Sequence, residues 1–317
     1  IMSSDWSSDV CSSDLSGANG TFVNETGGLS SGTVTVEVEI LDADGSDPVS
    51  ATALSQSDFE AINDGSLVLQ AGGDLTLIDG DTDDEVITAD GAGSIVLQVT
   101  GSLASDSLID GGSGNITITT SANLTLDSAG DETANILTTG TGTIDLNAGE
   151  AIFMTEGDTV GAGSGDIRIE AVDNLTLSFV STTGDVGLVS TSGSILDNAD
   201  SDPDVTATGL ALSAAGDIGS TTNPIETTVT TLSAFADGAN GVFLSESNEL
   251  DINQVVASVN RMGTDALVMS TETTDLSDVE TSNNGSIVLS TGGDLTLSDG
   301  DEDQFVVTAA TTGNILI

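Results

Sequence analysis

The stretch of sequence that decides the fold is GSGDIRIEAVDNLTL, residues 163–177. It contains two short predicted strands, over Ile167–Ile169 and Leu175–Leu177, because apolar residues alternate with polar ones in both. Glycines precede the first strand, and a small polar break separates the two strands. Each strand is too short to bury its apolar face alone. The pattern therefore predicts a fold in which many such segments stack on one another.

The same pattern recurs at a spacing of 19 to 28 residues. The first strands of successive units begin near Leu67, Ile95, Ile116, Ile144, Ile167, Val186 and Leu210. Parallel stacking of these strands supplies hydrogen-bond partners and a continuous apolar ladder, while Gly, Asn and Asp occupy the tight corners. The sequence predicts an all-β fold, a right-handed parallel β-helix (β-solenoid) of about 12–15 turns, on the order of 60–70 Å long. The best helical candidate, 51–62, has a poor 3.6-residue pattern.

A longer repeat contains the short one. Residues 64–97 align with 284–317 at a shift of 220, with 19 identities in 34 positions, and GANG at 17–20 recurs at a shift of 221. We predict a first superrepeat of about 220 residues at 16–236 and the start of a second, truncated one at 237–317, with both ends cut from a longer molecule. A string of antiparallel β-sandwich domains is the alternative. The scarcity of aromatic residues and the short internal period argue against it.

Residues 1–15, IMSSDWSSDVCSSDL, differ from the rest of the chain. They contain its one Trp and its one Cys, and Ser-Ser-Asp occurs in them three times. The run from Asp9 to Leu15 back-translates into the end of a common short-read sequencing adapter. We therefore interpret residues 1–15 as a disordered sequencing artefact, with a native low-complexity leader as the alternative. Without them the chain has no Cys, which excludes disulfides and thiolate sites.

The charge balance narrows the function classes. The chain has 52 acidic and 2 basic residues and a net charge of −50, with no His, Lys or Tyr. Nucleic acid and anionic membranes require cationic contacts, so neither is an expected partner. Catalysis by His or by a lysine Schiff base is excluded too. The two cations are Arg168 and Arg261, and we expect Arg168 to be an exposed surface residue because it stands at an outward strand position. No apolar run reaches the length of a membrane-spanning helix.

Four acidic runs stand out, and two of them occupy equivalent positions in the long repeat. Asp-x-Asp-x-Asp spacing presents several oxygens to one hard cation. The predicted Ca²⁺ ligands are Asp79, Asp81, Asp83, Asp299, Asp301 and Asp303. The other two runs lie at 42–47 and 197–202. Neither the run that begins at Asp79 nor the run that begins at Asp299 has the Gly and Glu that an EF-hand loop places at its sixth and twelfth positions. Solvated acidic turns are therefore the alternative.

The repeats have a counterpart among known bacterial proteins. The run at 163–177, together with GSGNITITTSANLTL at 112–126 and GGDLTL at 72 and 292, resembles the repeats of filamentous hemagglutinin-type adhesins. It is similar as well to giant repetitive outer-surface proteins of Gram-negative and planctomycete-like bacteria. The resemblance covers nearly all of residues 16–317 and specifies a solenoid more strongly than a function. It implies an exported rod.

The expected function is that of a structural stalk fragment of a large exported bacterial adhesin, in cell adhesion or in biofilm and surface structure. We expect no enzymatic activity and no cofactor apart from Ca²⁺. Expected partners are host or surface glycans and proteins, neighbouring cells and neighbouring repeats of the same chain, at the outer surface of a bacterium or outside it. The alternative is a carbohydrate-binding or carbohydrate-cleaving β-helix with Asp groups in a groove. Sugar platforms need stacking rings, and aromatic residues make up 3% of the chain.

Overall fold

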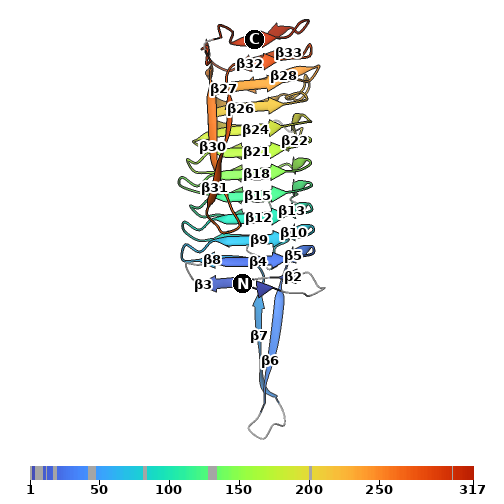
Figure 1. The fold of residues 1–317 in the computed structure, drawn as a ribbon, viewed down its shortest axis with the longest axis vertical. Helices are drawn as coiled ribbons and strands as arrows, with labels where there is room; N and C mark the ends of the chain where they lie inside the picture. The colour runs from blue at the N-terminus through green and yellow to red at the C-terminus, as the bar shows by residue number, and fades with distance from the viewer. Residues whose placement is uncertain are drawn as a thin grey trace.

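Parallel strands stack into a β-solenoid of about 10 turns in the computed structural model (Figure 1). The structure describes residues 2–3, 10–11, 13–16, 20–41, 48–80, 84–127, 134–199, 202–301 and 303–317, with the backbone alone for the strands within 2–16, 34–41 and 48–56. No helix occurs in these ranges, and thus none that could cross a membrane. The all-β parallel β-helix predicted from the sequence is confirmed. The predicted 12–15 turns are too many.

Three columns of strands, here called faces A, B and C, make up the wall. Face A contains β4 (Thr21–Glu25), β9 (Leu67–Ala71), β12 (Ile95–Val99), β15 (Ile116–Thr120), β18 (Ile144–Ala148), β21 (Ile167–Ala171) and β24 (Asp185–Ser190). Face B contains β5 (Leu29–Ser31), β10 (Leu75–Leu77), β13 (Leu103–Ser105), β16 (Leu124–Leu126), β19 (Ile152–Met154), β22 (Leu175–Leu177) and β25 (Ile195–Asp197). Face C contains β8 (Phe59–Ile62), β11 (Glu85–Ala89), β14 (Leu108–Asp110), β17 (Asn135–Leu137), β20 (Thr159–Gly161) and β23 (Phe179–Ser181). The long strands β26 (Val205–Ala214) and β27 (Ile225–Ala236) extend from face C onto face A.

Equivalent residues of successive turns pair directly, so the alternating sequence pattern becomes a continuous core. On face A, Ile116 pairs with Ile144, and Ile144 pairs with Ile167. All three side chains are fully buried in one hydrophobic cluster that extends through the stack. Burial of apolar surface against the next turn is what holds each short strand in place.

Glycines before the first strands of several inner turns are required by the stacking of the corners. A Cβ atom on Gly142 would overlap the carbonyl oxygen of Gly114 one turn below, and a Cβ atom on Gly114 would overlap that of Gly93. Backbone therefore touches backbone at this corner, and only glycine leaves room for it.

A hairpin built from β30 (Val255–Met262) and β31 (Val268–Leu276) leaves the stack and runs along the outside of face A (Figure 1). It contacts β15, β18, β21, β24 and β26. Beneath it lies a column of outward-facing residues, one per turn, which we call the outer ladder. The outer ladder consists of Phe22, Val68, Val96, Thr117, Asp145, Arg168, Gly187, Ala211 and Ser233. From Val68 to Ser233 all of its members are buried, although they point away from the core.

A second antiparallel hairpin, β6 (Val34–Leu41) and β7 (Pro48–Gln56), lies between β5 and β8 in the chain and extends beyond the N-terminal turn (Figure 1). The two hairpins explain the lower number of turns, because their residues add length to the chain without adding turns. The helical candidate at 51–62 is wrong: it contains the end of β7 and all of β8.

From β28 onward the strands repeat those that begin at β4. They are β28 (Gly241–Glu246), β29 (Leu250–Ile252), β32 (Val279–Thr281), β33 (Ser286–Thr291), β34 (Leu295–Leu297), β35 (Val307–Ala309) and β36 (Ile315–Leu316). This second set is rotated about the axis, because β29 and β32 both pair with β27 on face A, whereas their counterparts β5 and β8 belong to faces B and C. Hairpin β30–β31, which connects β29 to β32, therefore emerges over face A.

At the other end, β1 (Met2–Ser3), β2 (Val10–Cys11) and β3 (Ser13–Ser16) pair with β4, β5 and β8. These pairings do not test the origin of residues 1–15. The interpretation of that segment as an artefact stays a prediction, as does the division of the chain into 16–236 and 237–317.

Candidate functional site

The predicted ligands of the second acidic run come together at one edge of the solenoid. Asp299, Asp301 and Asp303 lie in the loop after β34, and Asp278 stands directly before β32 on the turn below. Each residue offers a carboxylate oxygen, and the four oxygens lie within 4.8 Å of one another. Asp278 is buried and has a φ of 65°, whereas the other three are exposed. Such an oxygen-only cluster has the chemistry of a Ca²⁺ site.

The first acidic run shows part of the same geometry. The backbone N–H of Gln304 donates to Asp299 at 2.9 Å. In the equivalent loop, the N–H of Asp84 donates to Asp79 at 3.3 Å. Asp81 and Asp83 lie outside the described residues. The Ca²⁺ assignment to both loops stays a prediction.

Asp278 is the ligand candidate that the sequence analysis missed. It is separated from Asp299 by the whole of β32, β33 and β34, so no spacing rule joins the two. The long repeat contained a signal for it, since Ser277-Asp278 recurs as Ser57-Asp58, each pair directly before a face strand.

A second carboxylate cluster forms where β25 and β26 meet β27. Asp197, Asp204 and Glu226 have oxygens within 4.8 Å of one another, and both aspartates are buried. The backbone N–H of Glu226 donates to Asp204 at 2.8 Å. Asp197 belongs to the acidic run at 197–202, but nothing in the sequence predicts that the turn above supplies Glu226.

Crowding among carboxylates perturbs their protonation. Burial raises the pKa of Asp278, and the charges of Asp301 and Asp299 add to the increase. Burial also raises the pKa of Glu280, with contributions from Asp303, Asp278 and Asp301. On face A, burial and then the charge of Asp166 raise the pKa of Asp185.

These raised pKa values predict that mild acid stabilises the fold. A carboxyl whose pKa is higher in the folded than in the unfolded chain takes up its proton first in the folded chain, so stability rises as the pH falls from neutral toward about 5. Glu272 acts in the opposite direction, because its pKa is lowered, mainly by a hydrogen bond from Ser270. The stability that this carboxylate contributes is lost only at lower pH, where it takes up a proton. We expect thermal unfolding midpoints in low salt and chelator to increase from pH 7.5 to pH 5. Asp278→Asn with Glu280→Gln should flatten this increase, and a midpoint that declines steadily over the range would contradict it.

Calcium is expected to stabilise the protein at neutral pH. Saturating Ca²⁺ should raise the unfolding midpoint by on the order of 5 °C, since a ligand that binds only the folded state adds to its stability. Asn substitutions at Asp299, Asp301 and Asp303 should reduce this response. The matched control replaces three exposed aspartates on separate turns, Asp90, Asp127 and Asp173, with Asn and should keep the response. An unchanged midpoint on chelation would refute the Ca²⁺ prediction.

The chain's two arginines meet at one buried carboxylate under the hairpin. Arg261 Nε donates to Asp145 Oδ2 at 2.6 Å, and its Nη2 donates to Oδ1 at 3.2 Å. Arg168 Nη1 lies 3.5 Å from the same Oδ1, and Arg168 also pairs with Glu170. Burial alone would lower the pKa of Arg261, but the hydrogen bond and charge of Asp145 and the charge of Glu272 raise it. Arg168 points outward as predicted, yet it is only 8% exposed because the hairpin covers it, so the expectation of a surface residue is wrong.

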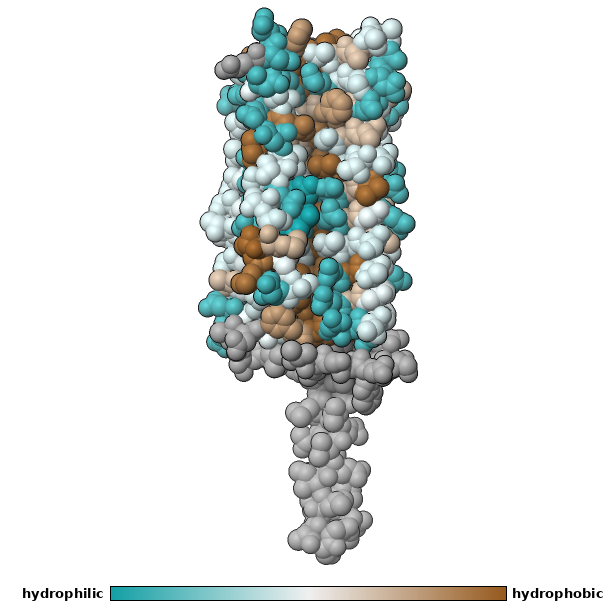
Figure 2. All heavy atoms as spheres, in the orientation of Figure 1, coloured by the Kyte–Doolittle hydropathy of each residue, from teal (hydrophilic) through white to brown (hydrophobic). Residues whose placement is uncertain are grey.

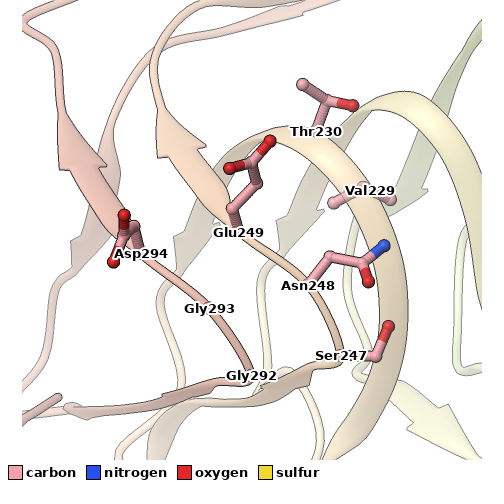
Figure 3. A pocket seen from close by; sticks show the side chains of 8 residues that line it. All are labelled: Val229, Thr230, Ser247, Asn248, Glu249, Gly292, Gly293 and Asp294. Carbon is pink, nitrogen blue, oxygen red and sulfur yellow. The ribbon is translucent and has the colours of Figure 1, made fainter.

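The cavity shown in Figure 3 has a volume of about 590 Å³ and lies between successive turns near the C-terminal end. Its lining residues are Val229, Thr230, Ser247, Asn248, Glu249, Gly292, Gly293 and Asp294. None of these eight is aromatic or basic. Glu249 and Asp294 occupy equivalent places before β29 and β34, which pair directly. The cavity therefore offers two like charges and no stacking ring for a sugar.

The surface on the side shown in Figure 2 is mostly hydrophilic or weakly polar, with separate hydrophobic areas. No protein-family model matches the sequence, and no curated protein and no solved structure is similar to it at a significant level. The structure shows the solenoid that the resemblance implies, and none of these comparisons supports an adhesin family.

Proposed function

We propose that the chain is a rigid structural segment of a bacterial surface adhesin, which holds a binding element away from the cell and does no chemistry itself. The observation that carries the proposal is the unbroken parallel ladder with one hydrophobic core through the stack. At about 10 turns the segment is on the order of 50 Å long.

Two further features support a passive rod. The charge of −50 keeps neighbouring rods apart by repulsion. The cavity of Figure 3 lacks the aromatic and basic groups that would favour the carbohydrate-binding alternative. A cavity of about 460 Å³ lined by Phe179, Glu156 and Asp202 is where that alternative would have to be tested. An extracellular position at the bacterial surface belongs to the same proposal.

The proposal is tested by adhesion under flow. Bacterial cells would display residues 16–317 between a surface anchor and a small domain of known ligand, and their detachment from ligand-coated glass would be followed as the shear increases. We expect adhesion only with the distal domain present. Leu77→Ala should cause detachment at lower shear, because Leu77 is fully buried in the core, and Leu297→Ala, at the exposed equivalent position, serves as the control.

Two results would overturn the proposal. One is adhesion that does not depend on the distal domain. The other is saturable glycan binding or polysaccharide cleavage by the purified chain, which would favour the carbohydrate alternative.

A further inference from the structure

Hairpins β6–β7 and β30–β31 are equivalent elements of the long repeat. Val34 corresponds to Val255 at a shift of 221, and Pro48 corresponds to Val268 at a shift of 220. The segments between the paired strands, 42–47 and 263–267, differ in length by one residue, which accounts for the change of shift. Both hairpins have their register irregularity at the same place, between Ile40 and Leu41 in one and between Arg261 and Met262 in the other.

The second hairpin binds the outer ladder through one strand face and one strand edge. Val255, Ala257 and Val259 of β30 are buried, and Met262 packs against Val68 and Val96.

The free edge of β30 is satisfied by side chains from successive turns. The backbone N–H groups of Ser258, Asn260 and Met262 donate to Asp166, Thr143 and Thr117 at 2.8, 3.0 and 2.9 Å. A strand edge that is satisfied in this way has no tendency to pair with another sheet.

The first hairpin has the sequence of a segment that binds the same kind of ladder. At the positions of Val255, Ala257 and Val259, strand β6 has Val34, Val36 and Val38. Its residue at the position of Arg261 is Ile40. Yet the outer ladder of this chain is covered by β30–β31, and Figure 1 shows β6–β7 extending away from the stacked turns.

We propose that β6–β7 is a clasp that lies along the outer ladder of a second copy of the 220-residue unit, stacked end to end against the N-terminal turn. The rotation between the two sets of strands supports this partner. It brings β29 and β32 onto face A and so places β30–β31 over the ladder below. In a chain without residues 1–15, whose strands β1–β3 occupy this end here, the same rotation would place the ladder of a second copy beneath β5 and β8, between which β6–β7 emerges. The proposal rests on the fold and is independent of the adhesin function.

The first test transplants the hairpin within this chain. Residues 255–276 are replaced by residues 34–56, and a second variant replaces 255–276 with a short turn. If β6–β7 fits the ladder, the transplanted chain has an unfolding midpoint well above that of the chain without a hairpin and close to that of the intact chain. Val36→Asp with Val38→Asp in the transplant should abolish that gain. Ile40→Arg should increase it, because an arginine there can pair with Asp145. A transplant no more stable than the chain without a hairpin, or indifferent to the Asp substitutions, overturns the proposal.

The second test places a true second copy beneath the hairpin. Residues 16–236 are joined without a linker to the start of residues 16–317, which preserves the GANG corner sequence at the junction. Amide hydrogen exchange of the inner β6–β7 should slow by at least about tenfold relative to the same hairpin in the 317-residue chain. Equal exchange in the two chains overturns the proposal, whatever the outcome of the adhesion test.

Discussion

Asp145→Ala is expected to lower the free energy of unfolding by about 3–5 kcal/mol, because it leaves two guanidinium groups close together in a buried site. Asp145 is fully buried, and it accepts two hydrogen bonds from Arg261 while Arg168 lies 3.5 Å away. Glu170 stays paired with Arg168 and Glu272 with Arg261, but both glutamates are partly exposed, whereas Asp145 is fully buried between the arginines. We expect the hairpin to detach before the solenoid unfolds.

Urea denaturation would measure the loss of unfolding free energy, and hydrogen exchange of the β30 amides would measure the detachment of the hairpin. The matched control replaces the buried carboxylate and both arginines by apolar groups of similar size, Asp145→Leu with Arg168→Met and Arg261→Met, so no unpaired charge remains at the buried centre. Glu170 and Glu272 lose their partners in this variant, but both are partly exposed to water. This triple variant should be close to the original protein in stability. Unchanged β30 protection in Asp145→Ala would show that the ion network does not hold the hairpin.

Leu77→Ala is expected to lower the free energy of unfolding by about 2–5 kcal/mol, whereas Leu297→Ala should lower it by less than about 0.5 kcal/mol. The two leucines end the same GGDLTL motif in successive copies of the long repeat. Leu77 is fully buried between turns, and Leu297 is 53% exposed in the last full turn. A solenoid turn packs only against the turns next to it. The same residue therefore contributes more to stability in an inner turn, with a neighbouring turn on each side, than in the last turn.

Chemical denaturation of the two variants would test this difference directly. Similar losses of unfolding free energy in Leu77→Ala and Leu297→Ala would mean that the last turn is packed as well as an inner one. A small loss at Leu77 would mean that the core can close around the missing side chain.

The turns were predictable from the sequence because their cause is local. Alternation at Ile167–Ile169 and Leu175–Leu177 fixes the inward face, and the corner glycines mark where backbone touches backbone. The hairpins could not be predicted in the same way. The residues of β6 alternate like those of a wall strand, and only the pairing partner decides that the segment leaves the stack.

The sites were predictable only where one loop supplies them. Asp299, Asp301 and Asp303 are near in sequence and near in space, but Asp278 reaches them from the turn below. Arg168 and Asp145 are paired neighbours on the outer ladder, and their burial depends on a hairpin that starts about a hundred residues later in the chain. Outward position in a strand therefore does not by itself mean exposure to water.

The direction of β30–β31 has a consequence for how the molecule responds to pulling. The solenoid strands lie across the axis, so tension applied at one end can peel the turns away singly, each step breaking only the pairing of one turn with the next. The hairpin lies along the axis and is fastened to strands from β15 to β26. Once peeling from the C-terminal end has removed β36 to β32, the next step must therefore break many hairpin contacts together, which raises the force that this step requires.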